Sequence, residues 1–330
     1  MTVRSALLLA GFLAFPTPDA AAQTAGSDIA GITLRLSSWT GVTGYEKTLG
    51  DSLLRLISKA ERDRIGNLRL RLGGGSAKRL LACPLDEPGY VIGGIRNDGY
   101  LTLRRVPGQV SPLFDQQIEG QRITIQGIRG DIPGVVAVRS IHLTRGRDDS
   151  GSTPFSVDNA FVDVGAFSAP QVRALGIKVL SPVTLTKRPH AYGDGLIAAP
   201  SAGRRAACAA LLLAVRESVR RAKLLPSVTV AFTVQQRLEN RGLGTIANRD
   251  GPFQETVIVD ASPGRLGSVD LRGAPDSTMQ ADSTDRWRGL GSVRRWFLPV
   301  RYAGTPVETV SMADADSLRQ ALVKWIGGDE

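Results

Sequence analysis

The stretch LACPLDEPGYVIGGIRNDGYLTLRRV, residues 81–106, contains the point at which the sequence changes from one pattern to another. Residues 79–83 form a short apolar run after the Gly-rich turn at 73–75, which is typical of a buried strand. From about Tyr90 to Leu185, short alternating runs are separated by Gly, Pro and Asp. This second pattern predicts a small β-barrel or β-sandwich that is inserted into a larger domain.

The segments on either side of the insertion alternate between strand-like and helix-like patterns. Strands are expected at residues 32–36, 67–72, 228–235 and 256–260, and helices at 43–57, 204–222 and 311–325. Thr43 with Glu46, and Ser311 with Asp314, have the spacing of a capping box at two of the helix starts. We therefore predict an α/β sandwich in which residues 32–84 and 186–330 form one discontinuous domain around the β-rich insertion, residues 85–185.

The N-terminal residues have the pattern of a secretory signal peptide. Arg4 precedes an apolar stretch at residues 6–15, and small residues at 20–22 provide a cleavage site after Ala22. We therefore expect residues 1–22 to be removed and the mature protein to be exported, to the periplasm or out of the cell. The apolar stretch is too short to cross a bilayer and no later segment is long and apolar enough, so no transmembrane anchor is predicted.

The chain of 330 residues is basic, with a formal net charge of +10 at pH 7. A basic surface attracts anionic partners such as nucleic acid, acidic polysaccharide or lipid headgroups. The arginines are scattered, however, and the sequence has no zinc-knuckle, RNA-recognition or helix-turn-helix signature, so specific nucleic-acid binding is not predicted. Cys83 and Cys208 are the two cysteines; in an exported protein they could form one disulfide, and two free buried thiols are an equally open interpretation.

Six segments carry a resemblance to a known family. They are residues 81–106, FVDVGAFSAPQVRALGI (161–177), AGRRAACAALLLAV (202–215), TVQQRLENRGLGTIA (233–247), VIVDAS (257–262) and RYAGTPVETVSMADADSLRQAL (301–322). In order and spacing they resemble the glutamyl-aminopeptidase/endoglucanase-like family of dinuclear zinc aminopeptidases, the group of the tetrahedral aminopeptidases in metallopeptidase clan MH. The resemblance implies a three-layer α/β sandwich with an inserted β-barrel-like dimerisation domain, and assembly into homo-oligomers, either dimers or larger shells.

The chemistry of that family requires two zinc ions that share a bridging carboxylate, and a glutamate that takes a proton from a metal-bound water. The resemblance places the first histidine ligand at Pro84 and the bridging aspartate at Gly203. It places the glutamate pair, a general base and a ligand, at Gln236 and Arg237, and the last histidine ligand at Gly304. Each of these residues differs from the one that its role requires, so we predict that zinc binding and catalysis are lost.

Three carboxylates remain near these positions. The resemblance implies that Asp86, followed by Glu87, orients the first ligand, and that Asp260 is a remaining ligand. The two histidines of the chain are not expected to replace the missing ligands. His142 matches a structural histidine of the inserted domain, and His190 is expected in an exposed loop.

Two carboxylates that lose their metal ions are costly to ionise if they are buried. We therefore predict that a guanidinium forms charge-assisted hydrogen bonds to Asp86 and Asp260, from one of three arginines: Arg204, Arg205 or Arg237. The alternative is that the two aspartates are solvated at the mouth of a cleft.

The predicted function is that of an exported, catalytically inactive aminopeptidase-like protein without a cofactor. It would bind a peptide or an anionic envelope component, or act as a scaffold. The alternative is a divergent metal-dependent aminopeptidase or hydrolase with a rebuilt site.

Overall fold

The computed structural model describes residues 29–57, 59–75, 78–106, 113–137, 155–221, 225–271 and 289–328. The expected signal peptide at residues 1–22 and His142 lie outside the described residues, so the statements about them stay predictions. None of the helices in the described ranges is both long and apolar enough to cross a membrane.

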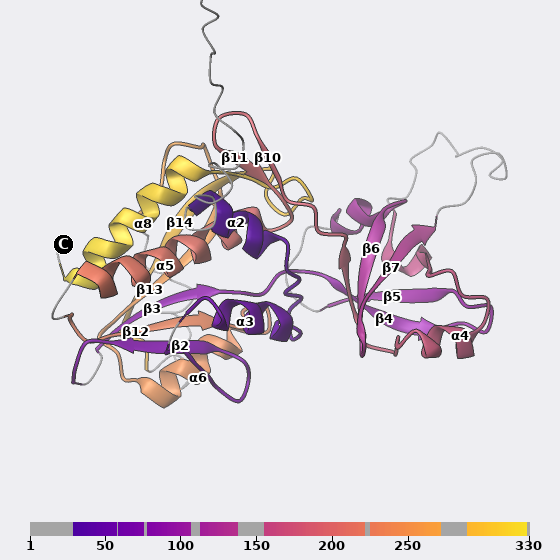
Figure 1. The fold of residues 1–330 in the computed structure, drawn as a ribbon, viewed down its shortest axis with the longest axis horizontal. Helices are drawn as coiled ribbons and strands as arrows, with labels where there is room; N and C mark the ends of the chain where they lie inside the picture. The colour runs from indigo at the N-terminus through magenta and orange to yellow at the C-terminus, as the bar shows by residue number, and fades with distance from the viewer. Residues whose placement is uncertain are drawn as a thin grey trace, which may run out of the picture.

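A sheet of nine strands forms the centre of the α/β part of the molecule (Figure 1). In spatial order the strands are β1 (Glu61–Arg62), β2 (Leu68–Leu72), β12 (Val228–Thr233), β3 (Arg79–Pro84), β13 (Glu255–Pro263), β14 (Ser292–Arg301), β15 (Thr309–Ser311), β11 (Leu196–Ala198) and β10 (His190–Tyr192). β3 pairs in parallel with both β12 and β13. Parallel strands are normally covered on both faces, which is why β12 is buried along its whole length.

Helices cover both faces of this sheet and complete a three-layer sandwich. α2 (Ile29–Ser37), α3 (Lys47–Leu54), α5 (Ala202–Arg221) and α8 (Met312–Gly327) share one apolar core with Leu81 of β3. α6 (Arg241–Asp250) packs on the opposite face, against Leu80 and Ala82. Successive residues of a strand point to opposite faces, so neighbouring residues of β3 belong to different cores. The predicted α/β sandwich is confirmed.

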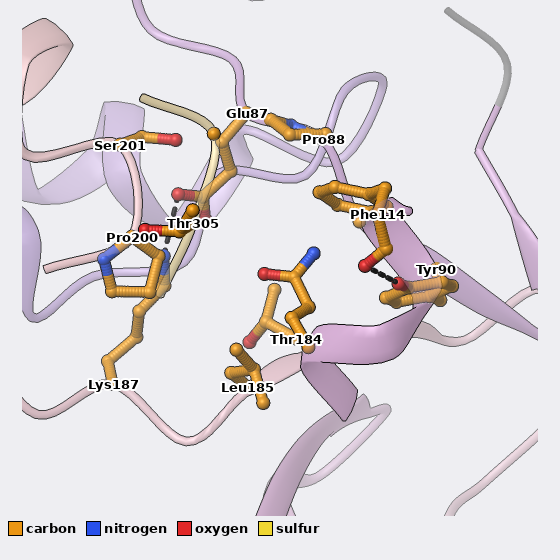
Figure 2. A pocket seen from close by; sticks show the side chains of 13 residues that line it. Glu87, Pro88, Tyr90, Phe114, Thr184, Leu185, Lys187, Pro200, Ser201 and Thr305 are labelled. Carbon is orange, nitrogen blue, oxygen red and sulfur yellow. Dashed lines mark hydrogen bonds and ion pairs between the residues drawn. The ribbon is translucent and has the colours of Figure 1, made fainter. Parts of the chain in front are cut away.

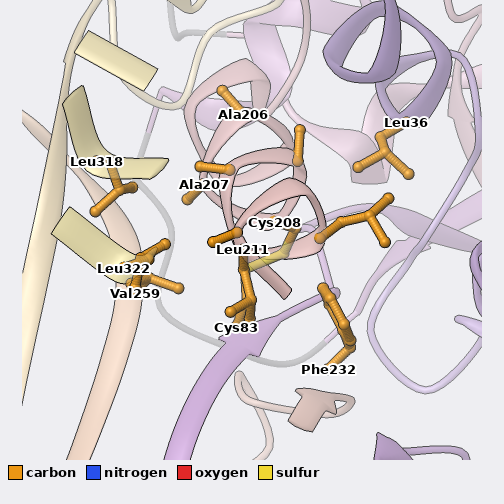
Figure 3. Close-up of a cluster of buried hydrophobic side chains, with 14 of the residues drawn as sticks. Leu36, Cys83, Ala206, Ala207, Cys208, Leu211, Phe232, Val259, Leu318 and Leu322 are labelled. Atoms are coloured by element: carbon orange, nitrogen blue, oxygen red, sulfur yellow. A yellow bond between two sulfur atoms is a disulfide. The ribbon is translucent and has the colours of Figure 1, made fainter. Parts of the chain in front are cut away.

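The long helix α5 lies directly on the sheet because many of its residues are small (Figure 3). Ala206, Ala207 and Leu211 are fully buried. Alanine side chains let the helix backbone approach the strands closely, so that Cys208 of α5 reaches Cys83 of β3. These two residues form a disulfide, which decides the question that the sequence left open.

The β-rich insertion is a closed barrel beside the sandwich (Figure 1). Its strands follow the order β4 (Tyr90–Ile95), β5 (Leu101–Arg105), β8 (Phe161–Asp163), β7 (Gly130–Ala137), β6 (Arg122–Gly127) and β9 (Pro182–Leu185). Short helices η1 (Phe114–Ile118), η2 (Val157–Asn159) and α4 (Ala169–Ala174) accompany the strands. The barrel has its own apolar core, to which alternate residues such as Ile123 and Ile125 contribute.

The predicted strand at residues 32–36 is wrong, because these residues belong to helix α2. The sequence ITLRL alternates between branched or apolar and polar residues and so imitates a strand. The buried residues are instead Ile32, Thr33, Leu36 and Ser37, which lie on one face of a helix. This face packs on α5, so a tertiary contact decides the conformation.

The two predicted capping boxes have different outcomes. At the start of α8, Ser311 Oγ accepts a hydrogen bond of 3.4 Å from the backbone amide of Asp314, as predicted. Before α3, Thr43 and Glu46 do not form a capping box, and Glu46 makes no side-chain capping bond. Both side chains bond to other segments instead, and these segments belong to the candidate site.

Candidate functional site

The candidate site lies at the edge of the sheet where its parallel strands end. β3 ends at Pro84 with β12 on one side and β13 on the other, so the loops after β3 and β12 meet Asp260 of β13. The N-terminus of α5 and the loop after β14 reach the same edge. The structure brings together the residues singled out from the sequence, which are Pro84, Asp86, Glu87, Gly203, Arg204, Arg205, Gln236, Arg237, Asp260 and Gly304.

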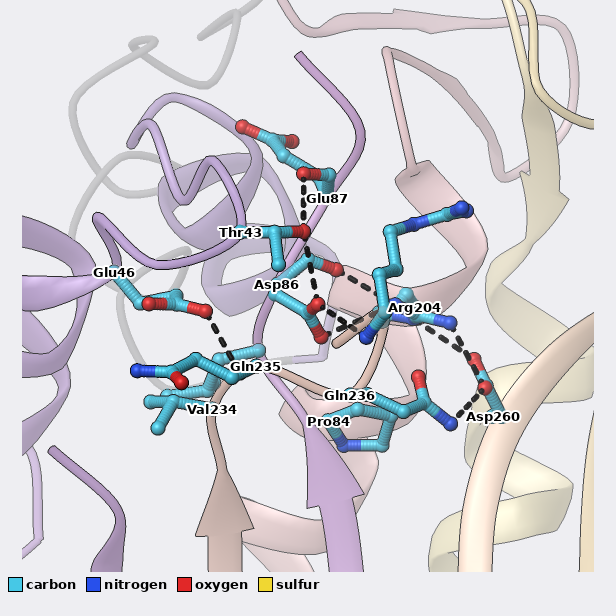
Figure 4. A network of polar contacts seen from close by, with 12 residues as sticks. Thr43, Glu46, Pro84, Asp86, Glu87, Arg204, Val234, Gln235, Gln236 and Asp260 are labelled. Carbon is cyan, nitrogen blue, oxygen red and sulfur yellow. Dashed lines mark hydrogen bonds and ion pairs between the residues drawn. The ribbon is translucent and has the colours of Figure 1, made fainter. Parts of the chain in front are cut away.

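Arg204 lies between the two aspartates (Figure 4). Its Nε and Nη2 each donate to one oxygen of Asp260, both at 2.9 Å, which is a bidentate pair. Its Nη1 donates to the carbonyl oxygen of Asp86 at 2.6 Å and lies 3.6 Å from the Oδ1 of the same residue. Burial alone would raise the pKa of Asp260, but the charge and hydrogen bonds of Arg204, together with the Ala261 amide and the charge of Arg295, lower it. The predicted guanidinium bond is confirmed for Asp260, and Arg204 supplies it. At Asp86 the same guanidinium bonds to the backbone carbonyl and not to the carboxylate.

Asp86 holds three segments of the site together. It is fully buried, and its Oδ2 accepts hydrogen bonds from Thr43 Oγ1 at 2.9 Å and from the backbone amide of Arg237 at 3.0 Å. Its carbonyl oxygen binds Arg204. The residue therefore ties the segment before α3, the loop after β12 and the start of α5 to the end of β3.

Gln236 and Arg237 follow β12 and face the same cluster. Gln236 Nε2 donates to Asp260 Oδ2 at 3.4 Å. The side chain of Arg237 is partly buried, and burial, with the nearby charge of Arg204, lowers the pKa of its guanidinium. Gln235 beside them has a positive φ of 55°, so the backbone makes a tight turn at this point.

Glu87 is the centre of a second buried charge cluster. Its Oε2 lies 2.6 Å from Lys187 Nζ and 3.1 Å from Arg205 Nη2, and its Oε1 accepts from the Gly41 amide at 2.9 Å. Burial would raise the pKa of Glu87, but the two cations outweigh it and lower the pKa. Arg205 therefore pairs with Glu87. Lys187 was missed from the sequence, since no local pattern links it to a residue 100 positions away.

Glu308 was also missed, and it joins two of the glycines. Its Oε1 accepts from the Gly203 amide at 3.0 Å, and its Oε2 accepts from the Gly304 amide at 2.9 Å. Burial raises the pKa of this carboxyl. Gly203 has no room for a side chain, because a Cβ atom there would lie 2.3 Å from Val300 Cγ1 and 2.6 Å from Ala261 Cβ. Gly304 has a positive φ of 73°, which favours glycine.

Glu46 is a further buried carboxyl of the site, and it is close enough to Asp86 to feel its charge. Its Oε1 accepts from the backbone amides of Gly44 at 3.0 Å and Gln235 at 2.8 Å. Burial is the main cause that raises the pKa of Glu46 to about 7, and the charge of Asp86 adds to it. This carboxyl is therefore partly protonated near neutral pH.

Donors for a metal ion are few at this edge of the sheet. Within the described ranges, no group of three or more His, Cys, Asp or Glu side chains is gathered as a metal site. His190 was expected in a loop but lies in the exposed edge strand β10, where its ring stacks on Tyr192. The carboxylates of Asp86 and Asp260 are already engaged by hydrogen bonds from neighbouring groups.

A pocket opens next to this cluster, between the barrel and the sandwich (Figure 2). Its cavity volume is about 40 Å³, and it widens into open solvent. Tyr90, Phe114 and Thr184 line it from the barrel, and Lys187 and Ser201 from the segments that lead back into the sandwich. The pocket borders the second charge cluster through Glu87 and Lys187, and Gly304, whose amide bonds to Glu308, also lines it.

The comparison with protein families decides the identity of the fold. The model of the M42 glutamyl aminopeptidases matches residues 66–265, which is more than half of the chain. The chain belongs to the M42 glutamyl aminopeptidase family. The resemblance seen in the sequence is therefore confirmed, and the matched range includes every site residue singled out from the sequence except Gly304.

Relatives of this M42 family member include proteins of bacteria and archaea. SgcX of Escherichia coli (strain K12) is 28% identical over 231 residues, which cover 67% of this chain and 59% of SgcX. The lysyl aminopeptidase of Pyrococcus furiosus is 31% identical over 145 residues, which cover 42% of this chain and 40% of that protein. The chain thus matches less than two thirds of the length of either relative.

Solved structures of TET peptidases share the fold of this M42 family member. The TET1 peptidase of Pyrococcus horikoshii, described as assembling into a tetrahedron or a large octahedral shell, has a TM-score of 0.76 at 22% identity, covering 91% of this chain and 99% of that one. The TET aminopeptidase of a Thaumarchaeota archaeon has a TM-score of 0.75 at 19% identity, covering 91% and 96%. The sandwich with its inserted barrel is therefore the fold of these peptidases.

Proposed function

We propose that this chain is a catalytically inactive member of its family that acts by binding. The observation that carries the proposal is the Arg204 guanidinium, which bonds to both oxygens of Asp260 and to the carbonyl oxygen of Asp86. A guanidinium keeps its positive charge at all relevant pH values and has no lone pair to offer a metal. Bound in this way, it competes with a divalent cation for the same carboxylates.

The residues present do not fit a pair of zinc ions. Zinc binds three or four N, O or S donors in a fixed geometry. Pro84 and Gly304 have no donor atom in their side chains, and Gly203 has no space for one because of Val300 and Ala261. We therefore derive no reaction step through zinc. The amide of Gln236 also cannot take the proton that a general base must accept.

A protein with this arrangement retains a buried polar cluster and an adjacent pocket, both suited to binding. We propose that the mature protein is exported and binds a peptide or an anionic component of the envelope. Its net charge of +10 supports an anionic partner. The pattern of residues 1–22 supports export, which mass spectrometry of the secreted chain would test by finding its N-terminus at Gln23.

We also propose that copies of this chain assemble through the barrel. The TET1 structure is described as forming closed shells, and the barrel here exposes large apolar side chains such as Ile128 and Phe167, at 70% and 85% exposure. Exposed apolar groups of this size favour contact with another surface. Light scattering should give an oligomer, and replacing Phe167 and Ile128 with serine should shift it toward the monomer. A monomeric wild-type protein would contradict this part of the proposal.

A peptidase assay tests the inactivity. The purified protein is incubated with added zinc and with lysyl, glutamyl and alanyl peptides, and release of N-terminal residues is followed by mass spectrometry. We expect no release above the background of a sample in which the protein was heat-denatured. Zinc-dependent release that disappears with a chelator would overturn the proposal in favour of a divergent aminopeptidase with a rebuilt site.

A further inference from the structure

We propose that the C-terminal end of α5, together with the last turn of α2, forms a surface that binds the anionic headgroups of a phospholipid bilayer. The inference rests on the proposed function for an anionic partner in the envelope, and it names the chemical class of that partner. The surface lies outside the Arg204 cluster, because α5 rises about 24 Å between Arg204 in its first turn and Arg220 in its last.

Three arginines, which we call the arginine cluster, lie near one another where α2 packs beside α5 (Figure 1). Arg216 and Arg220 are one turn apart on α5, and Arg35 is in the last turn of α2. Arg35 and Arg220 are exposed, and Arg216 is partly buried. Burial and the charges of Arg220 and Arg35 lower the pKa of Arg216, so Arg216 feels the positive charge of both other arginines. Like charges gathered in this way repel one another.

Each side chain of the arginine cluster is held by a neutral group. Arg216 Nη2 donates to the carbonyl oxygen of Leu56 at 2.6 Å, and Arg220 Nε donates to the carbonyl oxygen of Arg216 at 3.3 Å. The guanidinium of Arg35 lies 5.4 Å from the ring centroid of Trp39, which is a cation–π contact. These contacts position the three guanidinium groups, but none of them cancels a positive charge.

The carboxylate nearest in sequence to the arginine cluster is engaged elsewhere. Glu217 is the acidic residue of α5, and it forms ion pairs with Arg221 and Arg319. α2 contains no acidic residue. In the part of the chain that the structure describes, no carboxylate counters the two cations that act on Arg216. The positive charge is therefore available to an anion from outside the chain.

Apolar groups lie beside the arginine cluster and favour a lipid as its partner. Val219 lies on α5 between Arg216 and Arg220 and is 55% exposed. Trp39, under the guanidinium of Arg35, is partly buried. Surfaces that lie on bilayers combine arginines, which contact anionic headgroups, with aliphatic and tryptophan side chains, which enter the boundary of the acyl chains. An acidic polysaccharide offers the same negative charge but no hydrocarbon for Val219.

Co-sedimentation with vesicles tests the proposal. The purified protein is mixed with vesicles of phosphatidylcholine alone, or of phosphatidylcholine with phosphatidylglycerol. We expect the protein to sediment with the vesicles that contain phosphatidylglycerol and to stay in solution with the others. Binding should weaken as the salt concentration rises, because salt screens charges at a surface. Equal sedimentation with both kinds of vesicle, or with neither, would overturn the inference.

A double variant with Arg35→Gln and Arg220→Gln locates the surface. Both side chains are exposed, so the variant should unfold at the same urea concentration as the wild type. We expect its affinity for the anionic vesicles to fall by about tenfold or more, since each arginine near a lipid surface contributes about fivefold. The matched control carries Arg173→Gln and Arg249→Gln, which remove the same net charge from exposed positions in the last turns of α4 and α6.

The control should bind the anionic vesicles nearly as tightly as the wild type. An equal loss in both double variants would show that only the net charge matters, and it would refute the assignment of the surface. A labelled heparin fragment supplies an acidic polysaccharide for comparison. Binding of this fragment without binding of vesicles would overturn the choice of a lipid.

The outcome is separable from that of the proposed function, because vesicle binding involves neither zinc nor the Arg204 cluster. Zinc-dependent release of N-terminal residues would refute inactivity, while vesicle binding that depends on Arg35 and Arg220 would still establish the surface. An inactive protein that does not bind anionic vesicles would refute only the surface.

Discussion

Replacing Arg204 with methionine should produce a loss of stability that depends strongly on pH. The variant keeps a side chain of similar length but leaves the carboxylate of Asp260 without its bidentate partner. The side chains of Arg204 and Asp260 are 15% and 6% exposed, so solvent screens the pair only weakly. Removing one partner of a buried ion pair typically lowers the free energy of unfolding by about 3–5 kcal/mol, and we expect about 3 kcal/mol at pH 7.5.

The pH dependence has a definite sign. In the wild type the pKa of Asp260 is lowered on folding, so its contribution to stability is present above the unfolded value of 3.8 and is lost as pH falls through the folded value. In the variant the buried carboxylate has lost its nearest positive charge and keeps only the more distant Arg295, so burial should raise its pKa. Protonation then relieves the buried charge in acid, and the difference between the two proteins should shrink to about 1 kcal/mol near pH 4.5.

Urea unfolding followed by tryptophan fluorescence measures this difference. All tryptophans lie outside residues 85–185, so the signal reports on the sandwich and not on the barrel. Arg221→Met is the matched control, because Arg221 ends the same helix but its side chain is 71% exposed, and we expect a change of less than about 0.5 kcal/mol. A loss in Arg204→Met that is as small as the control, or that does not change with pH, would refute the reasoning.

Three further predictions concern neighbouring residues. Glu46→Gln should stabilise the protein by about 1–3 kcal/mol at pH 8 and by little at pH 5. The pKa of Glu46 is about 7 in the folded protein and 4.5 in the unfolded chain, so ionisation of the folded protein becomes increasingly unfavourable as pH rises through that range. Urea midpoints across this range would show the effect, and a gain at pH 5 as large as that at pH 8 would contradict it. Gly203→Asp should lower the free energy of unfolding by about 3 kcal/mol or more, because its Cβ would lie 2.3 Å from Val300 Cγ1. We expect this variant to bind no zinc. A stable variant that gains zinc would show that the site lacks only this ligand. Cys208→Ala should lower the free energy of unfolding by about 2–5 kcal/mol, since the disulfide closes a loop with a sequence separation of 125. Chemical reduction of the wild type should have the same effect. A reduced protein as stable as the oxidised one would contradict the stabilising role of the disulfide.

The sequence predicted most of the elements because their patterns are local. The apolar run at residues 79–83 became β3, and the alternating runs after Tyr90 became the barrel. The start of the chain was harder: the ITLRL pattern at 32–36 is compatible with a strand, and its packing on α5 makes it a helix. A contact with a helix that begins about 170 residues later is not visible in a local window.

The site residues that the sequence predicted are those at positions that a family motif defines. Arg204 follows Gly203 in such a motif, and it proved to be the arginine that binds Asp260. Lys187 lies outside the segments that carry the resemblance, and Glu308 lies within one of them but at a position to which no role was assigned. Their contacts span 100 and 105 residues of sequence. Such contacts depend on how the barrel and the loop after β14 fold back onto α5, which periodicity and spacing do not encode.

We propose that Arg204 and the substituted ligand positions leave no place for the family's zinc ions. Equilibrium dialysis of the purified protein against zinc, followed by elemental analysis of the protein fraction, tests this directly. We expect the zinc in the protein fraction to stay close to the level of the dialysis buffer. Retention of about two zinc ions per chain, as a two-metal site would hold, would contradict it.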